Sequence, residues 1–342
     1  MNVRSVAWLL GCSMLVACGE PSEEAKESSS DALDETDTPA PTPPMAGPRI
    51  DTTQIPTGHP GSGEFLIAPT SERPGASDGT GAFRTVCQFS HMNFDDPIVF
   101  PGVMDKAHLH TFFGNTRANA FSTAESLANL GNSTCRGGIA NRSSYWVPAL
   151  VDPRGVPIAP IEAHVYYKTG YGGVAPRDVR AFPQGLRMIA GDAKATSPDQ
   201  DFAYWDCLND GGKHPRGIPS CSEDDELQMT VEFPQCWDGK NLDSADHKSH
   251  MAYPEGSCPP SHPVAIPAIS FNIRYKAISN PAGYHLSSDN YDQAKPGGWS
   301  AHGDWFSAWD PAIVDAFVKN CDNAAVDCHS HLLGDGREML SP

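Results

Sequence analysis

Two histidines separated by one residue, His108 and His110, are the first side chains that could do chemistry together. In an extended segment, residues two apart point to the same side, so both imidazoles could face one metal ion or one substrate. The alternative is that both rings only hydrogen-bond loop backbone. The segment 105–115 is therefore a candidate metal or catalytic site.

A second polar cluster spans residues 236–254 and combines aspartates, histidines and lysines beside a cysteine. A helical turn would put His247 and His250 on one face, and Asp243 or Asp246 could orient an imidazole, act as a base or bind a cation. His250 is the expected third metal ligand beside His108 and His110. The alternative is a solvated loop whose Asp and Asn side chains make local turns. Side chains of this segment expected to touch a substrate are Trp237, Lys240, Asn241 and Tyr253.

A third cluster, residues 298–310, places the tryptophans Trp299, Trp305 and Trp309 around His302 and Asp304. The histidine and the aspartate are candidate catalytic groups. The indole rings suit stacking on sugars, with Trp299 and Trp305 as expected substrate contacts, but core packing would use the same rings.

Arg187, in the segment 182–192, could clamp a substrate carboxylate or pair with an aspartate of the protein. The chain has no Gly-x-Ser-x-Gly, no His-Glu-x-x-His, no phosphate-binding glycine loop and no dinucleotide fingerprint, which disfavours the enzyme classes that depend on them. A net charge of −18 without a basic patch disfavours nucleic acid as a partner.

The elements that must position these groups are mostly short strands. Alternating segments rich in branched and aromatic residues are 162–167, 227–233 and 268–275. Two helices are expected, over 120–130 and over 311–320, the second with Asp310 as its N-cap. The pattern predicts a mainly β fold, a β-sandwich or jelly-roll-like core with long loops and a few peripheral helices.

Cysteine usage indicates a disulfide-stapled domain. Two of the ten cysteines, Cys12 and Cys18, lie near the N-terminus, and the other eight are Cys87, Cys135, Cys207, Cys221, Cys236, Cys258, Cys321 and Cys328. An even number in an oxidising compartment predicts four disulfides. We expect Cys321 to pair with Cys328 and the four cysteines between 207 and 258 to pair among themselves. A zinc site is the alternative, although no Cys-x-x-Cys occurs.

The N-terminus has the pattern of an export signal. Arg4 precedes an apolar run over 6–16, and residues 15–18 resemble a bacterial lipobox, which implies removal of residues 1–17 and lipid on Cys18. An ordinary cleaved signal peptide is the alternative. Gly19 after the cysteine favours the outer membrane or the cell surface within the cell envelope. The acidic, proline-rich residues 18–60 are expected to be a disordered tether, with a single domain over 61–342.

Several ordered motifs carry a family resemblance. They are residues 96–99, 108–114, 144–148, 182–192, 236–254, 258–263 and 302–304. Together, over roughly residues 83–321, they resemble the domain of unknown function 1996 family; the chain departs from its pattern at 284–290. The resemblance implies a secreted protein of a kind sometimes fused to carbohydrate-binding modules, and it implies no particular reaction.

The clusters together predict one cleft that gathers titratable side chains. The residues expected there are His108, His110, Asp243, Asp246, His247, His250, His302 and Asp304. Burying such groups unpaired costs several kcal/mol each, so packing alone does not account for them. We expect an enzyme acting on extracellular polysaccharide, a hydrolase, lyase or oxidase, through a divalent metal or acid–base catalysis. The alternatives are a non-catalytic glycan- or wall-binding module and a structural surface protein.

Overall fold

The computed structural model describes residues 47–210, 212–214 and 216–342. The leader, Cys18 and the first part of the expected tether therefore lie outside the described residues. The tether was expected to extend to Pro60, but residues 47–60 pack against the domain: Ile50 and Ile55 contact its main core. The Asp51 amide also donates to the Gly155 carbonyl at 2.8 Å, so the folded part begins before Ser62.

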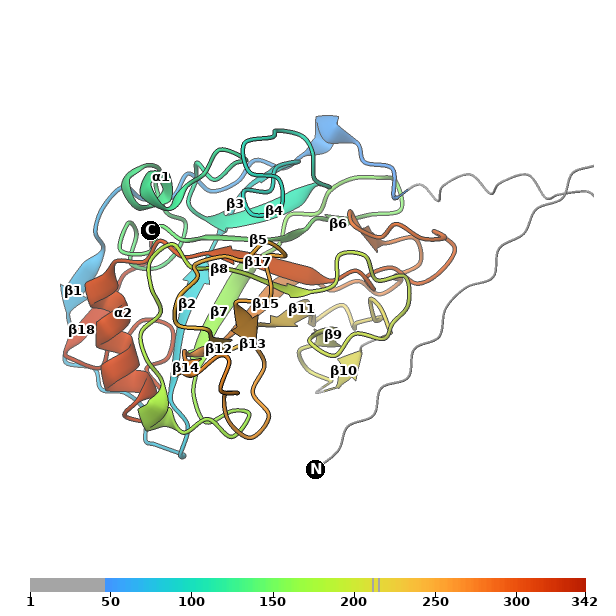
Figure 1. The fold of residues 1–342 in the computed structure, drawn as a ribbon. Coiled ribbons are helices and arrows are strands. Elements are labelled where there is room, and N and C mark those ends of the chain that lie inside the picture. Colours follow the sequence, from blue (N-terminus) through green and yellow to red (C-terminus); the bar gives the residue numbers. More distant parts are fainter. Residues whose placement is uncertain (1–46, 211, 215) are drawn as a thin grey trace, which may run out of the picture. The chain divides into compact units, whose positions relative to one another are not determined.

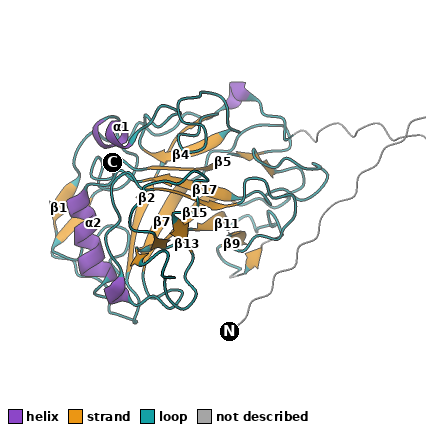
Figure 2. Cartoon of the chain, viewed as in Figure 1, coloured by secondary structure: helices purple, strands orange, loops and turns teal. Residues whose placement is uncertain are grey.

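Two antiparallel sheets stacked face to face form the body of the domain (Figures 1 and 2), which confirms the predicted mainly β fold. The six-stranded sheet has the order β10 (Lys213–His214), β9 (Ala203–Cys207), β11 (Glu226–Glu232), β15 (Ala268–Lys276), β7 (Glu162–Lys168) and β2 (Ala82–Cys87). The five-stranded sheet has the order β3 (Phe89–Asn93), β4 (His110–Gly114), β5 (Ser144–Pro148), β17 (His302–Phe306) and β8 (Arg187–Gly191). The three predicted strands are β7, β11 and β15.

Smaller elements surround the two sheets. The short pairings are β1 (Ile67–Pro69) with β18 (Arg337–Met339), β6 (Leu150–Val151) with β16 (His285–Leu286), and β12 (Cys236–Trp237) with both β13 (Met251–Ala252) and β14 (Val264–Ala265). The helical elements are η1 (Thr52–Gln54), α1 (Ala124–Asn129), η2 (Pro176–Asp178), α2 (Pro311–Phe317) and η3 (Val318–Asp322).

Both predicted helices are present, and both are shorter than expected. Asp310 caps α2 as predicted, because its side chain accepts the amides of Ala312 and Ile313; past Phe317 the chain continues as the π turn η3. The first helix begins only at Ala124. The Asn119 side chain accepts the amide of Phe121 at 2.8 Å, which holds the preceding residues in a local turn instead of a helix.

Alternation along the strands of the five-stranded sheet gives it two different faces. Phe113, Tyr145 and Trp305 point inward, into the main core shared with the six-stranded sheet, where the Tyr145 ring meets Phe271 at 5.6 Å between centroids. Trp309 lies in the same core. The sugar-stacking role considered for Trp305 and Trp309 is therefore wrong, since both side chains are almost fully buried.

The outer face of the five-stranded sheet carries a second, smaller core. Its centre is formed by Phe112, Trp146 and Phe306 on neighbouring strands, covered by Ile98 and Leu127. Since His110 and Phe112 are two residues apart on β4, and His302, Asp304 and Phe306 alternate along β17, the polar residues of these strands share this outer face. The small core thus supports the strands that carry the candidate site residues.

Four disulfides staple the domain, as predicted. They are Cys87–Cys135, Cys207–Cys221, Cys236–Cys258 and Cys321–Cys328. The last pair and the two pairs within 207–258 confirm the expected pairings. Within the described part of the chain, no helix has the length and apolar character needed to cross a membrane.

Candidate metal centre

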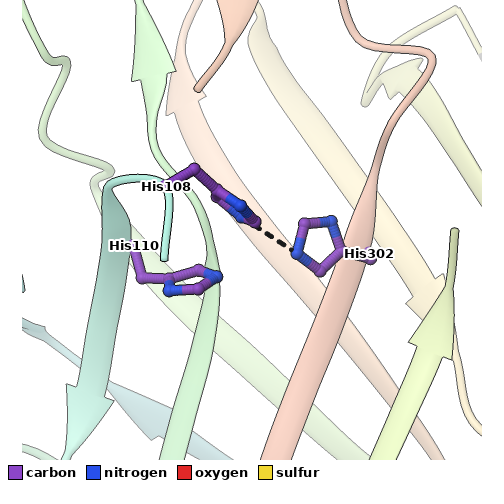
Figure 3. A group of neighbouring side chains, drawn as sticks. All are labelled: His108, His110 and His302. Carbon is purple, nitrogen blue, oxygen red and sulfur yellow. Dashed lines mark hydrogen bonds between the residues drawn. The ribbon is translucent and has the colours of Figure 1, made fainter. Parts of the chain in front are cut away.

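Three imidazoles converge on the outer face of the five-stranded sheet (Figure 3). His110 begins β4, His302 begins β17, and His108 reaches in from the loop just before β4. Strand β5 runs between β4 and β17, so His110 and His302 stand on strands about 10 Å apart and lean toward each other across it. The side chains come from positions almost 200 residues apart in sequence (His108 and His302 differ by 194).

The ring nitrogens are close enough to share one ion. His108 Nε2 lies 3.2 Å from His302 Nε2, and the His108 and His110 ring centroids are 4.2 Å apart. One possible ligand atom from each of the three rings lies within 4.8 Å of the others. Metal–nitrogen bonds of about 2.0–2.1 Å at tetrahedral angles separate two ligand nitrogens by roughly 3.3 Å. The His108–His302 spacing therefore suits two ligands of a single metal ion.

Backbone carbonyls fix which nitrogen of each ring is available. The Nδ1–H of His110 donates to the Asp95 carbonyl at 2.9 Å, and that of His302 donates to the Ser300 carbonyl at 2.8 Å. With hydrogen on Nδ1, each ring presents the lone pair of Nε2 to the centre. His110 Nε2 is buried and has no hydrogen-bond partner among the described residues. This second-sphere arrangement is the one that orients metal-binding histidines.

Burial keeps the imidazoles neutral. Loss of solvent lowers the pKa of His110 and of His302 to about 4. Desolvation, followed by the like charges of the other two rings, holds the pKa of His108 well below its ordinary value. Neutral imidazoles are the form that binds metal ions, so at neutral pH no proton must leave before a metal ion can enter.

Two carboxyl groups lie beside the imidazoles. Asp304 is 1% exposed, and its Oδ2 lies 3.9 Å from His302 Nε2 without a hydrogen-bond partner within the described chain. Asp96, His110 and Asp304 form a second group whose possible ligand atoms lie within 4.8 Å. Burial raises the pKa of Asp96, and it raises that of Asp304 well above its ordinary value. A bound cation would offset the cost of charging Asp304 here.

A His–Asp–Arg arrangement lies at the start of β8, at the opposite end of this strand from Gly191, which is paired with His302. His247 Nδ1 contacts both carboxylate oxygens of Asp243, at 2.9 and 3.1 Å, and Arg187 donates to the same carboxylate at 3.0 Å. The Arg187 guanidinium lies over the Phe306 ring at 4.5 Å. Arg187 therefore pairs with an aspartate of the protein, as the structural alternative expected.

The next residue links this arrangement to the metal centre. Lys248 donates to the Gly191 carbonyl at 2.9 Å, and Gly191 is paired with His302 in the sheet. The backbone of His247 has a φ of 57°, in the left-handed region that few residues with a side chain adopt. The polar segment 236–254 thus lies along the sheet edge beside the triad and contributes none of its ligands.

His250 is not a metal ligand, contrary to the prediction. Its ring is fully buried, its Nδ1 faces the Ser244 hydroxyl at 2.9 Å, and its Nε2 donates to the Arg187 carbonyl at 2.7 Å. Both ring nitrogens are therefore occupied, Nδ1 within the segment and Nε2 on the backbone of β8. His302 takes the place that His250 was expected to fill.

Asp246 also has a local role. Its carboxylate accepts hydrogen bonds from the backbone of Lys248 and Ser249 and from the hydroxyls of Ser244 and Ser249, and these bonds hold the pKa of Asp246 far below its usual range. The residues around it make turns and no helix. The predicted helical face shared by His247 and His250 does not form, because these bonds stabilise turns instead.

The remaining expected substrate contacts lie in three different places. Asp238 accepts the amides of Lys240 and Asn241, and Trp237 donates to the Asn241 carbonyl at 2.7 Å, so these residues form one self-contained surface turn. Trp299 is half-buried and stacks on Tyr291 at 4.8 Å. Tyr253, in contrast, lines two hollows described below.

Sequence reasoning missed residues that act through the backbone. Ser300 and Asp95 hold His302 and His110 by their carbonyl groups, which leave no side-chain signature. Asp289 is fully buried and accepts the amides of Leu286, Gly298 and Ser300. Asp289 lies in the segment 284–290, where the chain departs from the family pattern. The family resemblance therefore gave no reason to single out this residue.

A scan against family models matches residues 96–309 to the family described as "Domain of unknown function (DUF1996)". The chain belongs to this family. The matched range contains Asp96, His108, His110, His302 and Asp304, so the whole candidate centre lies inside the family domain. No curated protein and no solved structure matches the chain. Lipid attachment at Cys18 and a place in the cell envelope stay predictions.

Two neighbouring hollows lie on the surface of this DUF1996 domain. The first, of about 320 Å³, is lined by Gly191 and Lys248, the residues next to His302 and His247. The second, of about 340 Å³, lies over the six-stranded sheet. Phe202 and Tyr253 line both hollows, and their rings stack at 3.6 Å between centroids. An aromatic wall therefore separates the two.

Proposed function

We propose that this DUF1996 domain binds one divalent transition-metal ion through His108, His110 and His302 and acts with it on extracellular polysaccharide. The observation that carries the proposal is the convergence of the three rings, with Nε2 of His110 and of His302 directed to the centre by backbone carbonyls. Among the described residues, neither the buried Nε2 of His110 nor the buried Oδ2 of Asp304 has a hydrogen-bond partner, and a cation would supply one to both.

The donor set limits which metal the site accepts. Three imidazoles suit zinc, copper, iron or nickel, whereas calcium and magnesium prefer oxygen ligands. Asp304 supplies a carboxylate close to His302, and Asp96 lies next to it as a further negative group. Such a metal ion supplies Lewis-acid or redox chemistry at a site that buried side chains have already ordered.

His247 is the proposed proton-transfer group. Asp243 contacts its Nδ1, which leaves Nε2 for a substrate or a water molecule. Arg187 holds the aspartate in turn, so the imidazole is oriented before any ligand arrives. The side chain of His247 is 25% exposed, which allows exchange of protons with solvent.

Polysaccharide is the proposed substrate class because of two hollows on the surface of the domain. The two hollows offer aromatic surface together with polar groups, the combination that sugar rings need. Four disulfides fit a domain exposed to an oxidising compartment outside the cytoplasm, where such polymers occur.

Metal content of purified protein tests the centre. Chain purified without a histidine tag, stripped with chelator and dialysed against zinc, copper or nickel should hold one ion per molecule. His302→Ala should weaken binding by more than the roughly 10- to 100-fold that loss of an outer-shell partner causes. His164→Ala, a histidine on the other sheet, is the matched control and should bind like the parent. Absence of a stoichiometric metal in the parent would remove the proposal.

Turnover is tested on a polysaccharide panel with the metal-loaded chain. New reducing ends, unsaturated products and oxidised products distinguish hydrolysis, elimination and oxidation. Activity should disappear in His302→Ala and fall in His247→Ala while the latter still holds its metal. A loaded parent that turns over nothing would leave a metal-binding domain without the proposed enzymatic role.

A further inference from the structure

We infer that the hollow over the six-stranded sheet is a binding subsite for an uncharged glycan chain. The inference deepens the proposed function and rests on its polysaccharide part. The residues of this hollow lie on the outer face of the six-stranded sheet, whereas the three imidazoles lie on the five-stranded sheet.

The register of three neighbouring strands creates the hollow. On the outer face, Lys168 of β7 is paired with Ala268 of β15, and Glu232 of β11 is paired with Ser270 of β15. Two small side chains on the central strand thus lie between long side chains on strands about 10 Å apart. The short side chains of β15 leave a depression between the long side chains of β7 and β11. Its volume of about 340 Å³ falls in the range of small-molecule sites.

The polar groups at the sides are of opposite charge. Lys168 makes no ion pair with a carboxylate among the described residues, and its ammonium lies 4.3 Å from the Tyr166 ring centroid. Glu232 is held by the Tyr204 hydroxyl at 3.2 Å and by Lys213 at 3.5 Å. The hollow therefore presents a donor-only ammonium on one side and an acceptor-only carboxylate on the other.

This combination selects the class of ligand. A carboxylate drawn to Lys168 would also meet Glu232, and a cation drawn to Glu232 would also meet Lys168, whereas a hydroxyl both accepts from an ammonium and donates to a carboxylate. Sugar hydroxyls satisfy both sides at once without a net charge. An uncharged polyhydroxylated chain is therefore the complementary occupant.

Aromatic surface completes the match. Tyr171 lines the hollow and is 46% exposed, and Phe202 with Tyr253 forms its other wall. Aromatic faces pack against the apolar faces of pyranose rings while the hydroxyls reach polar groups. The Phe202–Tyr253 wall also borders the hollow lined by Gly191 and Lys248.

Binding by metal-free protein tests the inference independently of the metal centre. In chelator, the purified chain is titrated with uncharged oligosaccharides (gluco-, xylo- and manno-oligomers) and with charged ones (oligogalacturonate and chitosan oligomers), read by calorimetry. At least one uncharged series should bind, and more tightly than the charged series. Tyr171→Ala and Lys168→Met should each weaken that binding by about tenfold or more. Lys276→Met, an exposed lysine at the other end of β15, is the control and should change it less than twofold.

Each other result overturns the inference in a distinguishable way. Failure of every uncharged series, with metal stoichiometry intact, removes this subsite and leaves the metal centre standing. Tighter binding of a charged series shows that the ligand class is wrong. Uncharged binding that is unchanged in both variants places the glycan elsewhere on the molecule. Thermal unfolding of each variant shows that it is folded before its binding is compared.

Discussion

At the scale of single residues, Asp304 and Asp322 are both buried with carboxylate oxygens that have no partner in the described part of the chain, and Asp304 faces the candidate centre. Asp304 points toward the imidazoles, where a cation would compensate it. Asp322, at the end of η3, is fully buried and neither carboxylate oxygen has a hydrogen-bond partner among the described residues. Desolvation raises the pKa of Asp322 well above its ordinary value. Asp322 belongs to none of the candidate metal groups and hollows found among the described residues, so the cost of its burial falls on stability.

Asp322→Asn should therefore stabilise the protein at neutral pH. Since the folded pKa lies above the unfolded value near 4, the folded state binds more protons between the two, and the stability of the parent falls as pH rises through that window. The asparagine side chain does not titrate, so the stability of the variant does not fall in this pH window. Urea unfolding should show little difference at pH 4 and a gain of about 1–3 kcal/mol at pH 7.5. Asp315→Asn, an exposed aspartate on α2, should show no such pH-dependent gain. An equal effect at both pH values would contradict this account.

Some candidate site residues can be recognised from the local sequence, whereas others depend on contacts between distant parts of the chain. The His108–His110 spacing on an extended segment was sufficient to bring two candidate ligands together, because side-chain alternation is a local property of a strand. His302 was recognised as functional but not as the third ligand, since the pairing of β17 two strands from β4 is a long-range property. His250 was misassigned because nothing local shows that its ring bonds the Arg187 carbonyl, 63 residues away.

At the scale of elements, the strands and helices could be predicted from the pattern of apolar and polar residues. The loops that position the candidate centre could not. Alternation identified β7, β11 and β15, and the Asp310–Pro311 pair identified α2. The loop before β17 has no such period. Its shape depends on Asp289, one buried carboxylate that gathers amides from both ends of the loop.

Asp289→Asn should loosen this loop and with it the metal centre. The carboxylate accepts the Ser300 amide and hydroxyl, and the Ser300 carbonyl accepts Nδ1–H of His302. An amide in its place turns one acceptor into a donor facing N–H groups. Metal affinity should fall by about 10- to 100-fold, as for other losses of outer-shell support. Isothermal titration with the metal ion measures this, at a temperature where the variant is folded.

The control for that experiment separates positioning from general destabilisation. Asp225→Asn removes a comparable buried carboxylate that accepts the Asn209 and Glu226 amides on the six-stranded sheet. It should lower the free energy of unfolding while leaving metal affinity near that of the parent. If both variants lost metal equally, Asp289 would have no specific role in holding His302.

At the scale of the whole molecule, the two sheets share one core and divide the chemistry between their outer faces. The imidazoles stand on the five-stranded sheet, and the proposed glycan hollow stands on the six-stranded sheet. The Cys87–Cys135 disulfide joins the end of β2, in the six-stranded sheet, to the loop that precedes β5, in the five-stranded sheet. It therefore fixes one sheet relative to the other, whereas Cys321–Cys328 closes a short local loop.

Removing these two disulfides should have unequal effects on stability. The chain-entropy model depends on the length of the closed loop, and the sequence separations are 48 for Cys87–Cys135 and 7 for Cys321–Cys328. It gives a stabilisation of about 4 kcal/mol for the first and about 2.5 kcal/mol for the second. Guanidinium unfolding of the paired alanine variants should therefore show the larger loss for Cys87→Ala/Cys135→Ala. If the short loop mattered more, native contacts around η3, and not the entropy of the unfolded chain, would be the dominant contribution of these bonds.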